Sequence, residues 1–214
     1  MTHQEKLRRF DETDLYVVIT EAFCKTRSAL DVLDGVLEAG VKLVQLREKD
    51  CDDRHLYEMA VLSRKRTTEA DALLMIDDRI DVAMAVGADG VHLGQHDLPV
   101  RAARDLALNM LIGASTHNGE ELLRAQADGA SIVNIGPIFG TQTKETGMDP
   151  LGVDVLKALL PQVSVPWSCM GGIKAHNIDQ VIAAGARHPA VVTAVTEAEN
   201  VVQATKELRA KLKR

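Results

Sequence analysis

The residues best suited to chemistry in this sequence follow short apolar segments. The segment QLREK places Gln45, Arg47 and Lys49 at every second position, so their side chains share one face of an extended chain. Arginine binds a phosphate or carboxylate through two parallel hydrogen bonds, and lysine binds it as a point charge. The spacing therefore favours an anion-binding strand end, although pairing of these cations with Glu48 or Asp50 at a solvated strand end would also explain it.

Carboxylates follow the next two apolar segments. Asp77 and Asp78 stand in DDR, and Asp97 stands in GQHD. Two carboxylates at neighbouring strand ends can hold one Mg2+ whose other ligands are water and phosphate oxygens, and we expect Asp78 and Asp97 to do so. Each residue also has a structural interpretation, because Asp78 could cap a helix that begins at Ile80 and Asp97 a helix that begins after Pro99.

Histidines near Asp97 suggest a second kind of metal site, which we do not expect. His92 and His96 are four residues apart, a spacing that places two ligands together on a helix, but here it spans a strand end and a turn that contains glycine. The remaining candidates are hydroxyl, lysine and glycine-containing positions after the fifth to eighth apolar segments: Ser115, Thr141, Thr143, Lys144, Gly172, Val192 and Thr193. Such groups suit phosphate oxygens, and parallel barrels commonly bind phosphate in the loops after strands seven and eight.

An alternation of strands and helices must position these residues. Apolar runs rich in β-branched residues predict strands over 15–19, 43–47, 73–76, 90–93, 111–114, 132–135, 165–169 and 190–193, and amphipathic segments between them predict helices. A phrase of helix end, glycine and strand recurs at Gly40, Gly87, Gly129 and Gly185, which marks every second strand.

This pattern predicts a single-domain (β/α)8 TIM barrel over residues 14–214, preceded by a polar N-terminal extension over residues 1–13. A doubly wound open sheet is the alternative. In either architecture the ligand site lies at the carboxyl ends of the strands, so the candidate residues would meet in one place. The long segment from Gly136 to Gly152 is a candidate substrate flap.

Composition limits the classes of partner. The chain has 214 residues and a formal net charge of −6, which argues against nucleic-acid and membrane partners and leaves small anionic substrates open. It has no apolar run of the roughly 20 residues that a membrane span needs and no apolar signal segment near its N-terminus, so we expect a cytoplasmic protein. The three cysteines are widely spaced and predicted to be reduced. Homo-oligomer formation stays open.

Together, these motifs resemble the thiamine phosphate synthase family. QLREK, DDR, GADGVHLGQHDLP, GASTH, GPIFGTQTK and MGGI stand in the order that this family has, over about Leu15 to Glu197. The resemblance implies a transferase that couples 4-amino-5-hydroxymethyl-2-methylpyrimidine diphosphate to a thiazole phosphate, with Mg2+ and basic groups stabilising the leaving diphosphate. The thiazole nitrogen then attacks the resulting cation.

The resemblance also implies a role for each candidate. The pyrimidine substrate would contact Gln45, Arg47, Lys49, Asp77, Ser115 and Lys144, of which Arg47, Lys49, Ser115 and Lys144 are the catalytic candidates. Asp78 and Asp97 would hold Mg2+, and the thiazole phosphate would contact Thr141, Thr143, Gly172, Val192 and Thr193.

Some positions depart from the family pattern. Asp77 stands where asparagine is usual, Gly140 replaces a proline, and Met170 is bulkier than usual and would narrow the thiazole pocket. Two other functions therefore stay open at this point: a thiazole tautomerase-like isomerase, and a non-catalytic binder of phosphorylated thiamine precursors.

Overall fold

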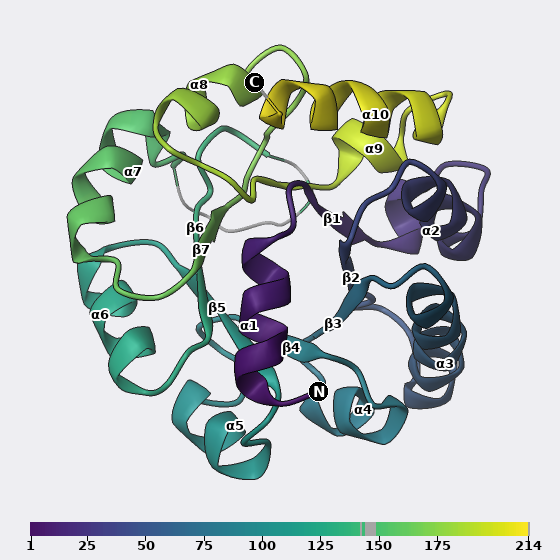
Figure 1. Cartoon of the computed structure of the whole chain (residues 1–214), viewed down its shortest axis with the longest axis horizontal. Coiled ribbons are helices and arrows are strands. Elements are labelled where there is room, and N and C mark those ends of the chain that lie inside the picture. The colour runs from purple at the N-terminus through teal and green to yellow at the C-terminus, as the bar shows by residue number, and fades with distance from the viewer. Residues whose placement is uncertain (142, 144–148, 214) are drawn as a thin grey trace.

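The structure, a computed structural model, describes residues 1–141, 143 and 149–213. In this part of the chain eight parallel strands form a barrel (Figure 1). They are β1 (Tyr16–Ile19), β2 (Leu43–Leu46), β3 (Leu73–Asp77), β4 (Gly90–Leu93), β5 (Leu111–Thr116), β6 (Ile132–Ile135), β7 (Trp167–Cys169) and β8 (Ala190–Val191). Strand β8 pairs with β1, and a bridge between Cys169 and Pro189 joins β7 to the segment before β8. The barrel prediction is confirmed, and the open-sheet alternative is wrong because the Cys169–Pro189 bridge joins the two edges of the eight-stranded sheet, β7 and β8.

Helices cover the outside of the barrel. They are α2 (Ala29–Glu38), α3 (Asp53–Glu69), α4 (Ile80–Val86), α5 (Val100–Leu106), α6 (Gly119–Ala127), α7 (Gly152–Leu159), α8 (Ile178–Ala183), α9 (Thr193–Thr196) and α10 (Val201–Leu212), with 3-10 turns at Glu21–Phe23 and Leu160–Gln162. The eighth strand is shorter than predicted, because α9 begins at Thr193 and leaves Val192 as its N-cap. No helix in the described residues is long and apolar enough to cross a membrane.

The two-residue period of the strands separates two cores. In β3, Leu74 and Ile76 pack among the residues between strands and helices, whereas Leu73 and Met75 pack inside the barrel. Asp77 is the next residue on the inward side, at the carboxyl end of the strand. Strand β3 therefore places apolar side chains inside the barrel and a polar one at its carboxyl end.

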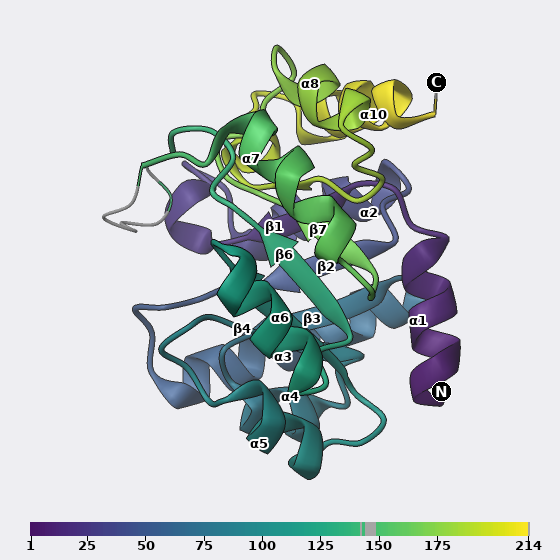
Figure 2. The same cartoon turned by 90° about the vertical axis from the view of Figure 1, so that its left-hand side faces the viewer.

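An additional helix, α1 (His3–Asp11), covers one end of the barrel (Figure 2). From the sequence, residues 1–13 are predicted only as a polar extension. Thr2 caps the helix in a reciprocal arrangement with Glu5, and its one aromatic residue, Phe10, is fully buried in the inner core. Polar composition hid the helix, because only a narrow stripe of it is buried.

The contact between α1 and the barrel contains a buried histidine. The His188 ring lies 4.6 Å from the Phe10 ring, centroid to centroid, and its Nδ1 is 3.2 Å from the Thr13 hydroxyl. Burial, with a smaller contribution from Arg187, lowers the pKa of His188 from 6.5 to about 4. The unfolded chain therefore binds this proton at a higher pH than the folded chain does, and the stability due to neutral His188 is lost as pH falls from about 6.5 towards 4.

We expect the free energy of unfolding to fall by about 2 kcal/mol more between pH 7 and pH 5 in the wild type than in His188→Gln. Urea unfolding at the two pH values measures this difference. The matched control, His55→Gln, replaces a half-exposed histidine on α3 and should keep the wild-type pH dependence. Equal pH dependence in all three proteins would contradict the assignment.

Candidate active site

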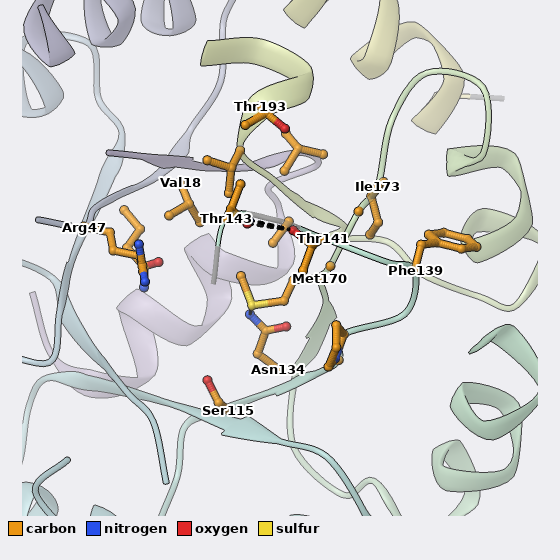
Figure 3. Close-up of a pocket in the computed structure, with 18 of the residues that line it drawn as sticks. Val18, Arg47, Ser115, Asn134, Phe139, Thr141, Thr143, Met170, Ile173 and Thr193 are labelled. Atoms are coloured by element: carbon orange, nitrogen blue, oxygen red, sulfur yellow. Dashed lines mark hydrogen bonds between the residues drawn. The ribbon is translucent and has the colours of Figure 1, made fainter. Parts of the chain in front are cut away.

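A cavity of about 900 Å3 opens at the carboxyl ends of the strands (Figure 3). It gathers nearly all the described candidates, although they are far apart in sequence: Gln45, Arg47, Lys49, Asp77, Asp78, Ser115, Thr141, Thr143, Gly172, Val192 and Thr193. Asp97 is not among the residues that line the cavity, but its carboxyl group hydrogen-bonds to that of Asp78, which does line it. Lys144 lies outside the described residues. The parallel barrel thus places the predicted candidates around one cavity.

One wall of the cavity combines cations with carboxylates. Asp77 Oδ2 lies 3.5 Å from Arg47 Nε and 3.2 Å from Lys49 Nζ, and Lys49 also binds Asp78. Burial alone would lower the pKa of Lys49, but the two carboxylates outweigh it and raise the pKa above its ordinary value. Glu48, one of the proposed alternative partners, instead accepts a hydrogen bond from the Glu21 N–H at 2.7 Å. The two cations therefore face the cavity as part of a charged network and not as a solvated strand end.

Asp78 and Asp97 form a hydrogen-bonded carboxyl pair. Burial, the charge of Asp77 and a hydrogen bond with Asp97 raise the pKa of Asp78 to about 7, against the opposing effect of Lys49. A hydrogen bond between two carboxyls requires that one of them keeps a proton. Asp78 also has a φ of +56°, a conformation that is uncommon outside glycine and recurs at functional sites.

The helix-capping interpretation of these two carboxylates is wrong. Helix α4 begins after Arg79 and α5 after Pro99, and neither N-cap residue makes a side-chain capping bond. Asp97 Oδ2 instead accepts the Gly94 N–H at 2.7 Å, within its own turn. The two side chains are thus held towards each other and not towards the helix ends.

Ser115 is held by two neighbours on one side of the cavity. His92 Nε2 lies 2.9 Å from Ser115 Oγ, and the ring is only 5% exposed. A Cβ on Gly113 would approach His92 Nδ1 to 2.6 Å, so glycine at this position makes room for the ring. Gln95 donates a hydrogen bond to the Ser115 carbonyl at 2.6 Å. His92 therefore orients the Ser115 hydroxyl. In the described part of the chain, no three or more His, Cys, Asp or Glu side chains form a cluster that could hold a metal ion.

The opposite side of the cavity is built from backbone that only glycine permits. Gly172 has a φ of +61°, and a Cβ there would lie 2.9 Å from Phe139 Cβ and also collide with the Gly140 carbonyl oxygen. Asn177 Nδ2 donates to the Gly172 carbonyl at 3.0 Å. The Gly172 turn therefore packs directly against Phe139 and Gly140, in the segment that leads to Thr141, with no room for a side chain at position 172.

Hydroxyls and one lysine surround this glycine turn. The Thr141 and Thr143 hydroxyl oxygens lie 2.8 Å apart, and Thr141 Oγ1 accepts the Thr143 N–H at 3.2 Å. Lys174 Nζ donates to the Thr193 hydroxyl and so connects the loops after β7 and β8. Lys174 was missed in the sequence, although a lysine directly after GGI at a predicted strand end was a usable signal.

Comparisons with known proteins identify the family. The family described as thiamine monophosphate synthase matches residues 15–195. The chain is 44% identical over 196 residues to a thiamine-phosphate synthase of Chloroflexus aurantiacus, covering 92% of this chain and 91% of the relative. A thiamine-phosphate synthase of Pyrococcus abyssi is 44% identical over 209 residues, or 98% and 96% of the two chains.

The chain belongs to the thiamine monophosphate synthase family. A solved structure agrees: a thiamine phosphate pyrophosphorylase from Pyrococcus furiosus matches with a TM-score of 0.88 and 36% identity, covering 96% of this chain and 98% of that one. The described cavity residues occupy the ends of the same barrel strands on which the family motifs lie. The cavity is also lined by His92 and Asn134. The sequence did not assign these two residues to the substrate site.

Proposed function

We propose that this family member couples 4-amino-5-hydroxymethyl-2-methylpyrimidine diphosphate to a thiazole phosphate, forming thiamine phosphate and diphosphate. The observation that carries the proposal is a single cavity with two anion-binding sides. Arg47 and Lys49 lie on one side, and the Gly172 turn with Thr193 and Lys174 lies on the other. Two phosphorylated substrates would be held with their reacting ends between these sides.

The first side suits departure of the diphosphate. The bond from the pyrimidine methylene carbon to the diphosphate oxygen breaks, and its electron pair leaves with the diphosphate. Arg47 and Lys49 would stabilise that negative charge, while Ser115, oriented by His92, would donate a hydrogen bond to the diphosphate or the pyrimidine. Lys144 would add a further positive charge. Asp77 would keep the two cations in place when no substrate is bound.

Asp78 and Asp97 suit a Mg2+ ion. Burial and the charge of Asp77 raise the pKa of Asp78, and a divalent cation bound between Asp78 and Asp97 would offset both effects. Two protein carboxylates are the set expected for Mg2+, which keeps several waters and binds substrate phosphates. When bound, Mg2+ would supply neutralisation of charge on the leaving diphosphate.

The second side suits the thiazole phosphate. Backbone N–H groups near Gly172, Val192 and Thr193 would bind its phosphate, with the Thr141 and Thr143 hydroxyls beside them. Lys174 would contribute positive charge. The ring nitrogen then attacks the methylene carbon and forms the new carbon–nitrogen bond. We place this reaction in the cytoplasm, on small substrates and without nucleic-acid or membrane partners.

A coupled assay tests the proposal. The purified protein with Mg2+ and both substrates should release thiamine phosphate and diphosphate in equal amounts. An isomerase would instead convert a thiazole phosphate without Mg2+ or the pyrimidine substrate, and a non-catalytic binder would show calorimetric binding without turnover. Absence of thiamine phosphate, with an active control enzyme in the same buffer, would reject the synthase function.

A further inference from the structure

A buried amide in the wall of the cavity has one atom without a partner. Asn134 lies on β6 and is 2% exposed. Its Nδ2 donates to the Met170 sulfur at 3.3 Å, whereas its Oδ1 is buried and accepts no hydrogen bond from the described residues. Burial of an unpaired carbonyl oxygen is unfavourable, so such an atom in a ligand cavity indicates a missing donor.

The orientation of this amide follows from its neighbour. A thioether sulfur is a weak acceptor, so the amide nitrogen belongs next to Met170. The reverse orientation would place two acceptors against each other. Figure 3 shows Asn134 between Met170 and Ser115 in the wall of the cavity. The unpaired atom is therefore an acceptor, and the cavity is where a donor can reach it.

A complementary atom lies on the opposite strand. Gln45 on β2 lines the same cavity, is 2% exposed and has an Nε2 donor without a partner among the described residues. In a ring of eight strands, β2 and β6 stand four strands apart, so the two amides approach the cavity from opposite sides. The cavity thus offers one unpaired acceptor and one unpaired donor to a ligand.

The chemistry of the two proposed substrates decides which one Asn134 recognises, so the inference rests on the proposed function. A 4-aminopyrimidine has N–H donors on its exocyclic amine and acceptors on its ring nitrogens. The thiazole ring has no N–H donor. We propose that Asn134 Oδ1 accepts a hydrogen bond from the 4-amino group of the pyrimidine substrate, and that Asn134 thereby selects amino- over oxo-pyrimidines.

Selection between the amino- and oxo-pyrimidine follows from the group at position 4 of the ring, which donates a hydrogen bond in the first and only accepts one in the second. An oxo group in place of the amine would place a second acceptor against Asn134 Oδ1 and leave both unpaired. Sites built to hydrogen-bond a substrate group discriminate strongly against analogues that lack it, because buried polar atoms then stay unsatisfied. A leucine at position 134 has the same branched shape and no acceptor, so it removes this discrimination.

The test compares kcat/KM for the 4-amino pyrimidine diphosphate and its 4-oxo analogue at saturating thiazole phosphate. We expect the amino-over-oxo preference to fall about tenfold in Asn134→Leu and Asn134→Ala, the size expected for one hydrogen bond, while KM for the thiazole phosphate changes less than twofold. The matched control is Ser168→Ala. Ser168 is the β7 residue paired with Asn134, is fully buried with an unpaired hydroxyl and is not among the cavity-lining residues.

The Ser168→Ala protein should keep the wild-type preference. An unchanged preference in both Asn134 variants would overturn the inference, as would an equal loss in Ser168→Ala. Calorimetry with the 4-amino and 4-oxo pyrimidine monophosphates separates this inference from the proposed function. If the wild type forms no thiamine phosphate but binds the amino compound better through Asn134, only the proposed function fails; if it is active and Asn134→Leu keeps the preference, only this inference fails.

Discussion

Replacing Asp78 with asparagine is expected to lower kcat/KM for the pyrimidine diphosphate by about 10²- to 10³-fold, the loss typical of removing one charge-stabilising group from an active site. The substitution leaves Asp97 as the sole carboxylate of the pair and removes a ligand of the proposed Mg2+. The half-saturating Mg2+ concentration should rise as well. Steady-state rates over a Mg2+ titration measure both effects.

Stability should not fall with activity. Burial and the neighbouring carboxylates raise the pKa of Asp78, which means that the folded protein disfavours its charged form. Asparagine removes that charge, and it tolerates the φ of +56° at this position better than most residues. The thermal midpoint of Asp78→Asn should therefore equal or exceed that of the wild type.

The matched control is Asp81→Asn, three residues further along the chain. Asp81 pairs with Arg79 on the surface, and its side chain is 63% exposed, so its loss should leave kcat/KM and the Mg2+ requirement unchanged. Asp97→Asn should reproduce the effect of Asp78→Asn from the other carboxylate. Full activity of both carboxylate variants at limiting Mg2+ would exclude the pair as the metal site.

The agreement between sequence and structure has a physical basis in the barrel. Strand positions followed from apolar runs, and parallel strands bring their carboxyl ends to one edge, so Arg47 and Thr193 could be placed in one site without any knowledge of packing. The N-terminal helix α1 could not be predicted in the same way. The helix buries only Lys6 and Phe10, and a single buried apolar side chain gives no apolar period in the sequence.

Contacts that depend on the direction of a side chain could not be predicted from the sequence. The capping interpretation of Asp78 rested on its position before Ile80, whereas the structure gives it a φ of +56° and a hydrogen bond with Asp97. Asn134 stands inside an apolar run, and only the strand pairing shows that it faces the cavity and not the helices. His92 was considered only as a metal ligand, because its bond to Ser115 joins different strands.

The second large effect is expected from Gly172→Ala, which should lower kcat/KM for the thiazole phosphate by about a hundredfold. The new Cβ would collide with Phe139 and the Gly140 carbonyl, so either the Gly172 turn or the segment that leads to Thr141 must move. A displacement of about 1 Å at a substrate-positioning group can cost about this factor in rate. Initial rates at varied thiazole phosphate, with the other substrate saturating, measure the loss.

Gly185→Ala isolates the backbone contribution to this effect. Gly185 also has a positive φ, +100°, but no atom lies within 4 Å of the Cβ that the substitution would add. The residue precedes β8, at the end of the barrel away from the cavity. Gly185→Ala should lose about 1–2 kcal/mol of unfolding free energy, because alanine is strained at positive φ, and Gly172→Ala should lose at least as much because of its added collision. Only Gly172→Ala should lose activity. An equal fall in kcat/KM for both would assign the effect to general destabilisation; a fall confined to Gly172→Ala ties it to the collision at the cavity.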